Sequence, residues 1–236
     1  MFPSSGFGQN GRENTSQFLV ADGATQTSFS NLWAKCLIES CSRTHLSEVS
    51  FLRAVKSAQM EWNKNLEGVE LPWHAQEKLR QGAFSALTWL EIQYFPLQPT
   101  YSFTWRALAV GDCCLFIARN RMIYLSLPLQ KHTDFTNTPV LIPSKSEKLN
   151  SISGKIQTAR GSLKMGDQLI LASDAFSSWI MKKAQTDHGE ILNKAISIKK
   201  TKNSRGFSDW VNALRSKNEI KNDDTSLIFI ELGEVD

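Results

Sequence analysis

The sequence lacks the features of several protein classes, and these absences narrow the possibilities before any motif is considered. Across its 236 residues there is no repeat, no low-complexity tract and no break in composition, which favours one domain over two. No apolar run is long enough to cross a membrane, and the N-terminus does not have the pattern of a signal peptide. We therefore expect no membrane association.

Cysteine and histidine are scarce, and neither is spaced as metal ligands usually are. The four cysteines form two close pairs, Cys36 with Cys41 and Cys113 with Cys114. Neither pair has metal-ligand spacing and adjacent cysteines seldom bridge each other, so we expect reduced thiols in a cytoplasmic protein. Cys113 is open to two interpretations, a redox-sensitive thiol or an inert buried one. The four scattered histidines are expected to be ordinary surface or core residues.

The charge is mildly basic, with a formal net charge of +4. Lysine and arginine are concentrated between Lys182 and Lys221, a pattern that suits either an acidic partner or a solvated face, of which the solvated face is favoured. No basic–aromatic interleaving accompanies this stretch, so we expect no nucleic-acid partner. The hydrophobic fraction of 41% is sufficient for a sizeable core.

Hydrophobic periodicity divides the chain into blocks of helices and strands. Residues 1–16 are rich in Gly, Ser, Asn and Gln and are predicted to form a flexible arm before a single domain over 17–236. The predicted strands are 17–21, 83–94, 103–110, 115–118, 122–127, 155–160, 168–172 and 225–232, with 155–160 and 168–172 forming a hairpin. Helices are predicted before residue 82 and between 175 and 217. Because the elements come in blocks, we expect an α+β protein with mostly antiparallel sheets.

Acidic residues stand where three short apolar segments begin or end. Asp22 follows the run from Phe18 to Ala21, Asp174 follows the run from Leu169 to Ala172, and Asp223 precedes the last strand. Each aspartate alone is explained by a helix cap or a first-turn acid, which contributes about 1 kcal/mol. Carboxylates that meet in space need a cation between them, because like charges at close range are mutually destabilising.

The order of these motifs resembles that of the metal-dependent serine/threonine protein phosphatases of type 2C, the PPM family. That family has segments reading Val-Ala-Asp-Gly, Gly-Asp-Ser, Ser-Asp-Gly, and Asp-Asn or Asp-Asp before a final strand. The corresponding segments here are Val20-Ala21-Asp22-Gly23, Val110-Gly111-Asp112-Cys113, Ala172-Ser173-Asp174-Ala175 and Asn222-Asp223-Asp224-Thr225. The resemblance covers nearly the whole chain, from about residue 18 to residue 232.

The resemblance implies a four-layer α-β-β-α sandwich, with two mostly antiparallel sheets packed face to face, flanked by helices, and a metal site at one end. It implies that Asp22 bridges two Mg²⁺ or Mn²⁺ ions, that the Gly23 carbonyl ligates one of them, and that Asp174 and Asp223 hold the other. Asp112 either closes a turn or serves a weak third ion. Asp224 is expected to support the ligand or form the turn.

The function implied by the resemblance is hydrolysis of phosphoserine or phosphothreonine in proteins. The nucleophile would be a hydroxide shared by the two metals, and the substrate a phosphoprotein made by a serine/threonine kinase. The two hard ions prefer oxygen ligands and retain water, which fits a site made of aspartates.

The chain departs from the family's pattern near its N-terminus. The family has Asn-Glu-Asp before the first of these strands, whereas this chain has Arg12 and Glu13 in that region and no Asp before Asp22. Ala175 replaces the Gly of Ser-Asp-Gly, and Cys113 replaces the Ser of Gly-Asp-Ser. These departures favour the alternative of a pseudophosphatase, a binding module of the same fold. The intact aspartates favour the enzyme.

Overall fold

The fold is described by a computed structural model that covers residues 7–8, 14–24, 29–69, 73–97, 100–201 and 204–233. The helical elements are α1 (Ser30–Ser42), α2 (Glu48–Leu66), α3 (Trp73–Gln81), η1 (His132–Asp134), η2 (Ser146–Ile152), α4 (Asp174–Ala184), α5 (His188–Thr201) and α6 (Ser204–Ser216). The strands are β1 (Phe7–Gly8), β2 (Asn14–Gly23), β3 (Phe84–Leu97), β4 (Thr100–Val110), β5 (Cys114–Arg119), β6 (Met122–Leu127), β7 (Ile142–Pro143), β8 (Gln157–Leu163), β9 (Gln168–Ala172) and β10 (Leu227–Glu231).

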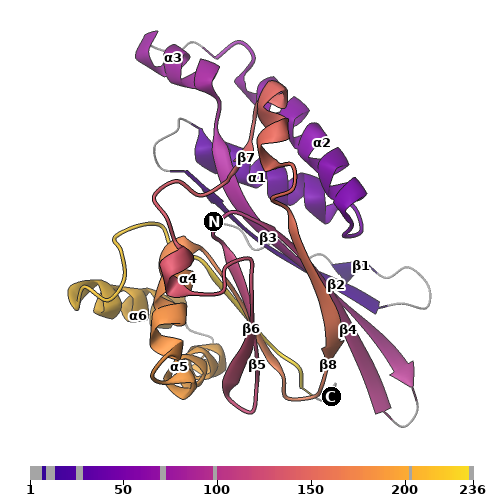
Figure 1. Ribbon diagram of the computed structural model, residues 1–236, viewed down its shortest axis with the longest axis vertical. Helices are drawn as coiled ribbons and strands as arrows, with labels where there is room; N and C mark the ends of the chain where they lie inside the picture. Colours follow the sequence, from indigo (N-terminus) through magenta and orange to yellow (C-terminus); the bar gives the residue numbers. More distant parts are fainter. Residues whose placement is uncertain are drawn as a thin grey trace.

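The strands form two sheets. The first has the order β1-β2-β3-β4-β8, with β7 pairing to β3, and the second has the order β10-β9-β5-β6. Every strand pairing among the described residues is antiparallel. Figure 1 shows α1 and α2 beside the first sheet and α4, α5 and α6 beside the strands of the second.

Alternation of side chains along the strands produces the four layers. In β3, Leu87 and Trp89 pack with residues of α1 and α2, whereas Leu90 faces the second sheet. In β5, Leu115 faces the first sheet and Phe116 packs with α4 and α6. The predicted α-β-β-α sandwich is therefore confirmed, with one apolar cluster between the sheets and one under each helical layer.

The predicted hairpin of 155–160 with 168–172 is wrong. Strand β8 pairs with β4 in the first sheet, whereas β9 pairs with β5 and β10 in the second. The physical reason lies in the side chains. Strand β8 is mostly polar and exposed and suits a sheet edge, whereas β9 is buried along its whole length and needs a strand on both sides.

The N-terminal region is described only in part. Strand β2 begins at Asn14, earlier than predicted, and in β1 Phe7 pairs with Ser16 and Gly8 with Thr15. The rest of the predicted arm lies outside the described residues, so the arm over 1–16 and the domain over 17–236 stay predictions. Within the described residues, no helix has the length and apolar character needed to cross a bilayer.

Candidate functional site

The predicted aspartates come together from both sheets. Asp22 is the second-last residue of β2, Asp174 is the first residue of α4 and follows β9 by one residue, and Asp112 lies in the turn between β4 and β5. Partial burial, followed by the negative charges of Asp174 and Asp112, raises the pKa of Asp22 to about 8. A weaker contribution of the same sign comes from Asp223. Three acids distant in sequence from Asp22 are thus close enough to it to disfavour its ionisation.

The pKa values of the neighbouring acids show the same crowding. Burial and then the charge of Asp174 raise the pKa of Asp112 to about 6, while the cation of Lys221 acts in the opposite direction. Burial also raises the pKa of Asp174, although the neighbouring Asp22 carboxyl group acts in the opposite direction as a hydrogen-bond partner. Lys221 lies close to both Asp112 and Asp174 and was not singled out from the sequence, where it ends a basic run expected to be solvated.

Two glycines allow the backbone to pack closely around these acids. A Cβ atom on Gly23 would lie 2.6 Å from the carbonyl carbon and oxygen of Ser30, so α1 starts against a position that only glycine fits. Gly111 has φ +98°, and its Cβ would lie 2.6 Å from the Ala86 side chain. Ser85 Oγ donates a hydrogen bond to the Asp22 carbonyl oxygen at 2.8 Å, which fixes the Asp22–Gly23 peptide.

Ser173 joins the start of α4 to the loop that carries Asp223. Its backbone N–H donates to the Ser226 carbonyl at 3.1 Å, and its Oγ accepts from the Ser226 N–H at 3.1 Å. The same Oγ donates to the Asp224 carbonyl at 3.3 Å. From α6, the Arg215 guanidinium donates to the Asp223 carbonyl. These bonds hold Asp223 beside Asp174, and neither Ser173 nor Arg215 was predicted to do so.

The donor set fits a hard divalent cation, although the side chains are not oriented around one. Among the described residues, no group of three or more His, Cys, Asp or Glu side chains is arranged to hold a metal ion. Instead, the Asp22 and Asp174 carboxyl groups lie close enough to share a proton, and Asp223 Oδ1 accepts from the Asp224 N–H at 2.8 Å. A shared proton and a shared cation are alternative ways to offset like charges. The residues that would hold the ions therefore stay a prediction.

Other predicted features of the site have different outcomes. Arg12 and Glu13 lie outside the described residues. Cys113 is fully buried, and burial together with nearby acids raises its pKa well above the ordinary value, as for an inert thiol. All four cysteines are buried and free of disulfides, as predicted from their spacing.

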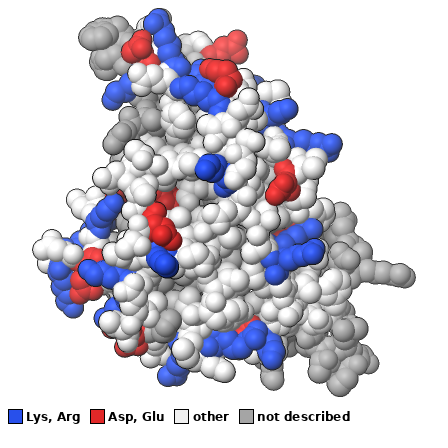
Figure 2. All heavy atoms as spheres, in the orientation of Figure 1, with Lys and Arg blue, Asp and Glu red and all other residues white. Residues whose placement is uncertain are grey.

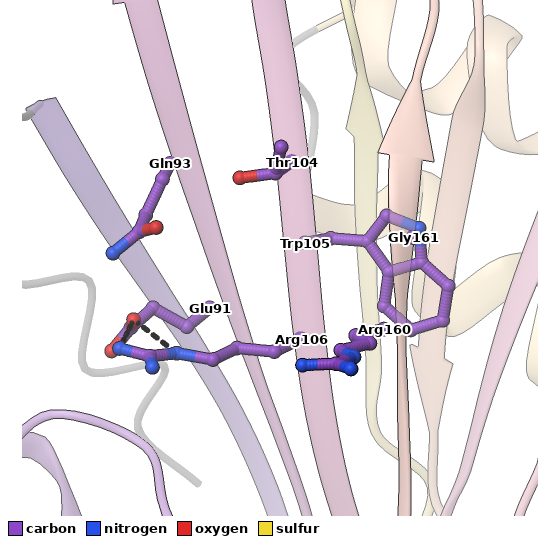
Figure 3. A pocket seen from close by; sticks show the side chains of 7 residues that line it. All are labelled: Glu91, Gln93, Thr104, Trp105, Arg106, Arg160 and Gly161. Atoms are coloured by element: carbon purple, nitrogen blue, oxygen red, sulfur yellow. Dashed lines mark hydrogen bonds and ion pairs between the residues drawn. The ribbon is translucent and has the colours of Figure 1, made fainter.

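A hollow of about 450 Å³ lies on the outer face of β3, β4 and β8, away from the aspartates (Figure 3). It is lined by Glu91, Gln93, Thr104, Trp105, Arg106, Arg160 and Gly161. Glu91 is buried and accepts from Arg106 Nε at 2.7 Å, the Leu46 N–H at 3.0 Å and Gln17 Nε2 at 3.2 Å. The ion pair of Glu91 with Arg106 therefore supports the connection between α1 and α2, which contains Leu46. It does not reach the acid cluster, because Gln17 in β2 is five positions from Asp22, about 17 Å along a strand.

The charged side chains do not form a continuous basic surface on the described part of the face in Figure 2. Basic and acidic side chains are interspersed there. The lysines and arginines seen in this view are thus not gathered into one patch, and the expected character of the stretch from Lys182 to Lys221 stays a prediction.

No protein-family model and no curated protein sequence matches this chain. Similarity to solved structures is extensive but low in identity. The Mycobacterium tuberculosis serine/threonine phosphatase PstP/Ppp has a TM-score of 0.53 at 12% identity, covering 99% of this chain and 97% of that chain. The catalytic domain of PstP in complex with two manganese ions has a TM-score of 0.52 at 12% identity, covering 99% and 96%.

A third similar structure is the S. agalactiae serine/threonine phosphatase, with a TM-score of 0.54 at 11% identity, covering 97% of this chain and 98% of that chain. The match extends over essentially the whole length of each protein, so it concerns the complete sandwich and not one supersecondary unit. The chain has the α-β-β-α fold of the type 2C serine/threonine phosphatases, the fold that its motifs implied.

Proposed function

We propose that this protein is a divalent-metal-dependent phosphatase acting on phosphoserine or phosphothreonine in proteins. The observation that supports the proposal most strongly is the convergence of Asp22, Asp112, Asp174 and Asp223 at one end of the sandwich. Acids that crowd around Asp22 and Asp112 and raise the pKa of both form a site suited to cations, and perturbed carboxyls cluster at functional sites. The substrate would be a phosphoprotein produced by a serine/threonine kinase.

The proposal assigns a separate role to each of the residues at the acid cluster. Asp22, the Gly23 carbonyl, Asp174 and Asp223 would hold two Mg²⁺ or Mn²⁺ ions, and Asp112 a weak third. When bound, such ions lower the pKa of water and offset charge on phosphoryl oxygens. Ser85 fixes the Asp22–Gly23 peptide by its hydrogen bond to the Asp22 carbonyl.

A pseudophosphatase of the same fold is the second candidate, and one observation favours it. The cation of Lys221 acts on both Asp112 and Asp174 and lowers their pKa values, and the Asp22 and Asp174 carboxyl groups lie close enough to share a proton. An acid cluster partly neutralised by lysine and proton has less need of metal ions. In that case the protein would act by binding a partner, without turnover.

Hydrolysis of a phosphothreonine peptide separates the two candidates. The enzyme should release phosphate in millimolar Mn²⁺ or Mg²⁺ and stop when the ions are chelated. Asp174→Asn should be inactive, whereas the control Asp209→Asn, which changes an exposed acid on α6, should behave as the wild type. Absence of turnover in folded wild-type protein with Mn²⁺ would favour the pseudophosphatase, and turnover that survives chelation would exclude the metal-dependent mechanism.

A further inference from the structure

A largely apolar groove of about 490 Å³ runs from the acid cluster between the edges of the two sheets. We call it the edge groove, and define it by the residues that line it: Leu19, Val20, Ala21, Asp22, Gly23, Asn31, Leu32, Ala34, Lys35, Ile38, Glu39, Asp224, Ser226, Leu227 and Ile228. Its walls are therefore β2, α1 and β10. One end is formed by Asp22 and Gly23, which makes the groove continuous with the candidate site.

The β2 wall presents a strand edge that no described strand covers beyond Ser16. Strand β1 pairs with β2 only at Thr15 and Ser16. On the other side, the Ala24 N–H donates to the Phe84 carbonyl at 2.9 Å, so the even-numbered residues of this stretch direct their backbone groups to β3. Since antiparallel residues alternate in this direction, Leu19, Ala21 and Gly23 direct their N–H and C=O groups toward the groove.

The β10 wall is an edge as well, because this strand is last in the second sheet. The Leu232 N–H donates to the Asp167 carbonyl, and the Ser226 carbonyl accepts from Ser173, so even-numbered residues pair with β9. By the same alternation the backbone of Leu227 points away from β9. Every residue of β10 is only half-buried although four of the five are apolar, as expected for a strand that has no described strand on its outer side.

Four charged residues line the groove, and two of them, Asp22 and Asp224, are acids of the candidate site and its loop. Lys35 and Glu39 on α1 form an ion pair at 3.8 Å, so this rim carries no net charge. Leu32 and Ile38 of α1 are both partly buried apolar residues. Leu19 to Gly23 span about 14 Å of strand, the length of a five-residue extended segment. The groove thus offers strand hydrogen bonds and apolar pockets, the two requirements for binding an extended peptide by strand addition.

We propose that the edge groove binds the substrate polypeptide next to its phosphorylated residue, as an extended strand along β2 with apolar side chains toward α1 and β10. This inference rests on the proposed function for the identity of the peptide. Continuity of the groove with Asp22 and Gly23 places the phosphorylated residue at the acid cluster. The substrate class is therefore a phosphopeptide with an apolar, strand-forming flank, and charged or proline-rich flanks are disfavoured.

The test is anisotropy of a fluorescein-labelled peptide that has an apolar flank beside an unphosphorylated threonine, so that binding to the groove is read without turnover. An added strand directs only every second backbone amide toward β2, and we call the two alternate sets of flank amides the two methylation phases. Strand addition predicts that N-methylation in one phase weakens binding, whereas N-methylation in the other phase does not. The loss should be about fivefold for each hydrogen bond removed. Leu32→Lys should weaken binding by placing a cation in the groove, whereas Val49→Lys, on an exposed position of α2, should not.

Equal effects of the two methylation phases, or unchanged binding by folded Leu32→Lys, would overturn the proposal. If Leu32→Lys does not fold, the methylation series on wild-type protein still decides. A concentration-dependent dimer that Leu32→Lys abolishes, with no peptide binding, would assign the groove to a second copy of this chain and overturn the proposal too. A peptide that binds in the predicted phase, but whose phosphothreonine form is never hydrolysed in Mn²⁺, would support the groove while the proposed phosphatase activity fails.

Discussion

The Asp22 carboxyl group, near the end of β2 in the first sheet, lies beside the Asp174 carboxyl group, at the start of helix α4 after β9 of the second sheet, close enough to share a proton. The contact joins the two halves of the sandwich through a pair of partly buried acids. Nothing in local structure requires it, since Ser173 and not Asp174 occupies the N-cap position of α4. Acids placed together in this way lower the stability of the metal-free protein at neutral pH.

The first prediction concerns that pH dependence. Folding raises the pKa of Asp22 from an ordinary 3.8 to about 8 and that of Asp112 to about 6. A raised pKa means that the folded state binds protons more tightly, so the stabilisation is complete below pH 4 and is lost as the pH rises toward 8. Thermal unfolding in chelator should therefore show a midpoint that falls by several degrees between pH 5 and pH 8, at about 2–4 °C per kcal/mol.

Two comparisons sharpen this prediction. Asp22→Asn, which cannot ionise, should flatten the decline, whereas Asp209→Asn on the exposed side of α6 should preserve it. Millimolar Mn²⁺ should raise the midpoint more at pH 8 than at pH 5, because cations compete with protons for the same carboxylates. A wild-type midpoint that rises steadily between pH 5 and pH 8 in chelator would contradict the acid cluster.

The second prediction concerns the contact between Gly23 and α1. In Gly23→Ala the new Cβ would lie 2.6 Å from backbone atoms of Ser30, which cannot rotate away as a side chain can. The start of α1 must then move, and we expect a loss of about 1–3 kcal/mol in the free energy of unfolding, typical of overpacking. Urea unfolding measures it. Gly233→Ala, with no atom within 4 Å of the added Cβ, is the matched control and should be nearly neutral.

Much of the fold was predictable because the buried strands have distinctive sequences. The apolar run from Leu169 to Ala172 indicates a strand covered on both faces, and β9 is buried throughout. Asp22 and Asp174 could be placed at strand ends from the chain alone. That they meet could be inferred only from the order of motifs, because the meeting depends on how two separate sheets pack.

The failures share a physical cause, which is that they depend on non-local neighbours. The sequence indicates that β8 is a strand, but it does not indicate the strand with which β8 pairs. The pairing with β4 depends on where the chain lies relative to the edge of the first sheet. Lys221 and Arg215 belong to a basic stretch that looks solvated, and only the fold brings them to the acids. Glu91 is buried because Arg106, Leu46 and Gln17 converge on it, and no local pattern indicates this.

The third prediction separates the two roles of Asp112. If it serves a weak third ion, Asp112→Ala should slow phosphopeptide hydrolysis, by about 10–100-fold if it acts as a supporting group, and leave the tight metal binding measured by calorimetry unchanged. Asp112→Asn keeps an acceptor for the residue's own backbone N–H, the contact that lowers its pKa. Equal slowing in both variants indicates loss of charge. A marked loss of stability in Asp112→Ala alone indicates that the side chain closes the turn.

The last prediction separates Asp223 from its neighbour Asp224. Both acids precede the same strand, but of the two it is Asp223 whose charge raises the pKa values of Asp22 and Asp112. The Asp223 carbonyl is held by Arg215, and its Oδ1 accepts from the Asp224 N–H at 2.8 Å, so an asparagine at 223 can keep the loop in place. Asp224 contributes a carbonyl to Ser173, which a side-chain change does not remove.

An amide in place of a ligand carboxylate keeps the shape but removes the negative charge that offsets a cation. We therefore expect Asp223→Asn to abolish hydrolysis and weaken Mn²⁺ binding severely, and Asp224→Asn to retain most of both, since supporting groups typically account for only about 10–100-fold. Mn²⁺ titration and phosphopeptide hydrolysis measure the effects, with circular dichroism confirming each fold. An inactive Asp224→Asn beside an active Asp223→Asn would shift the ligand by one residue. If neither change has an effect, the aspartates cap and close turns, and the cluster holds no metal.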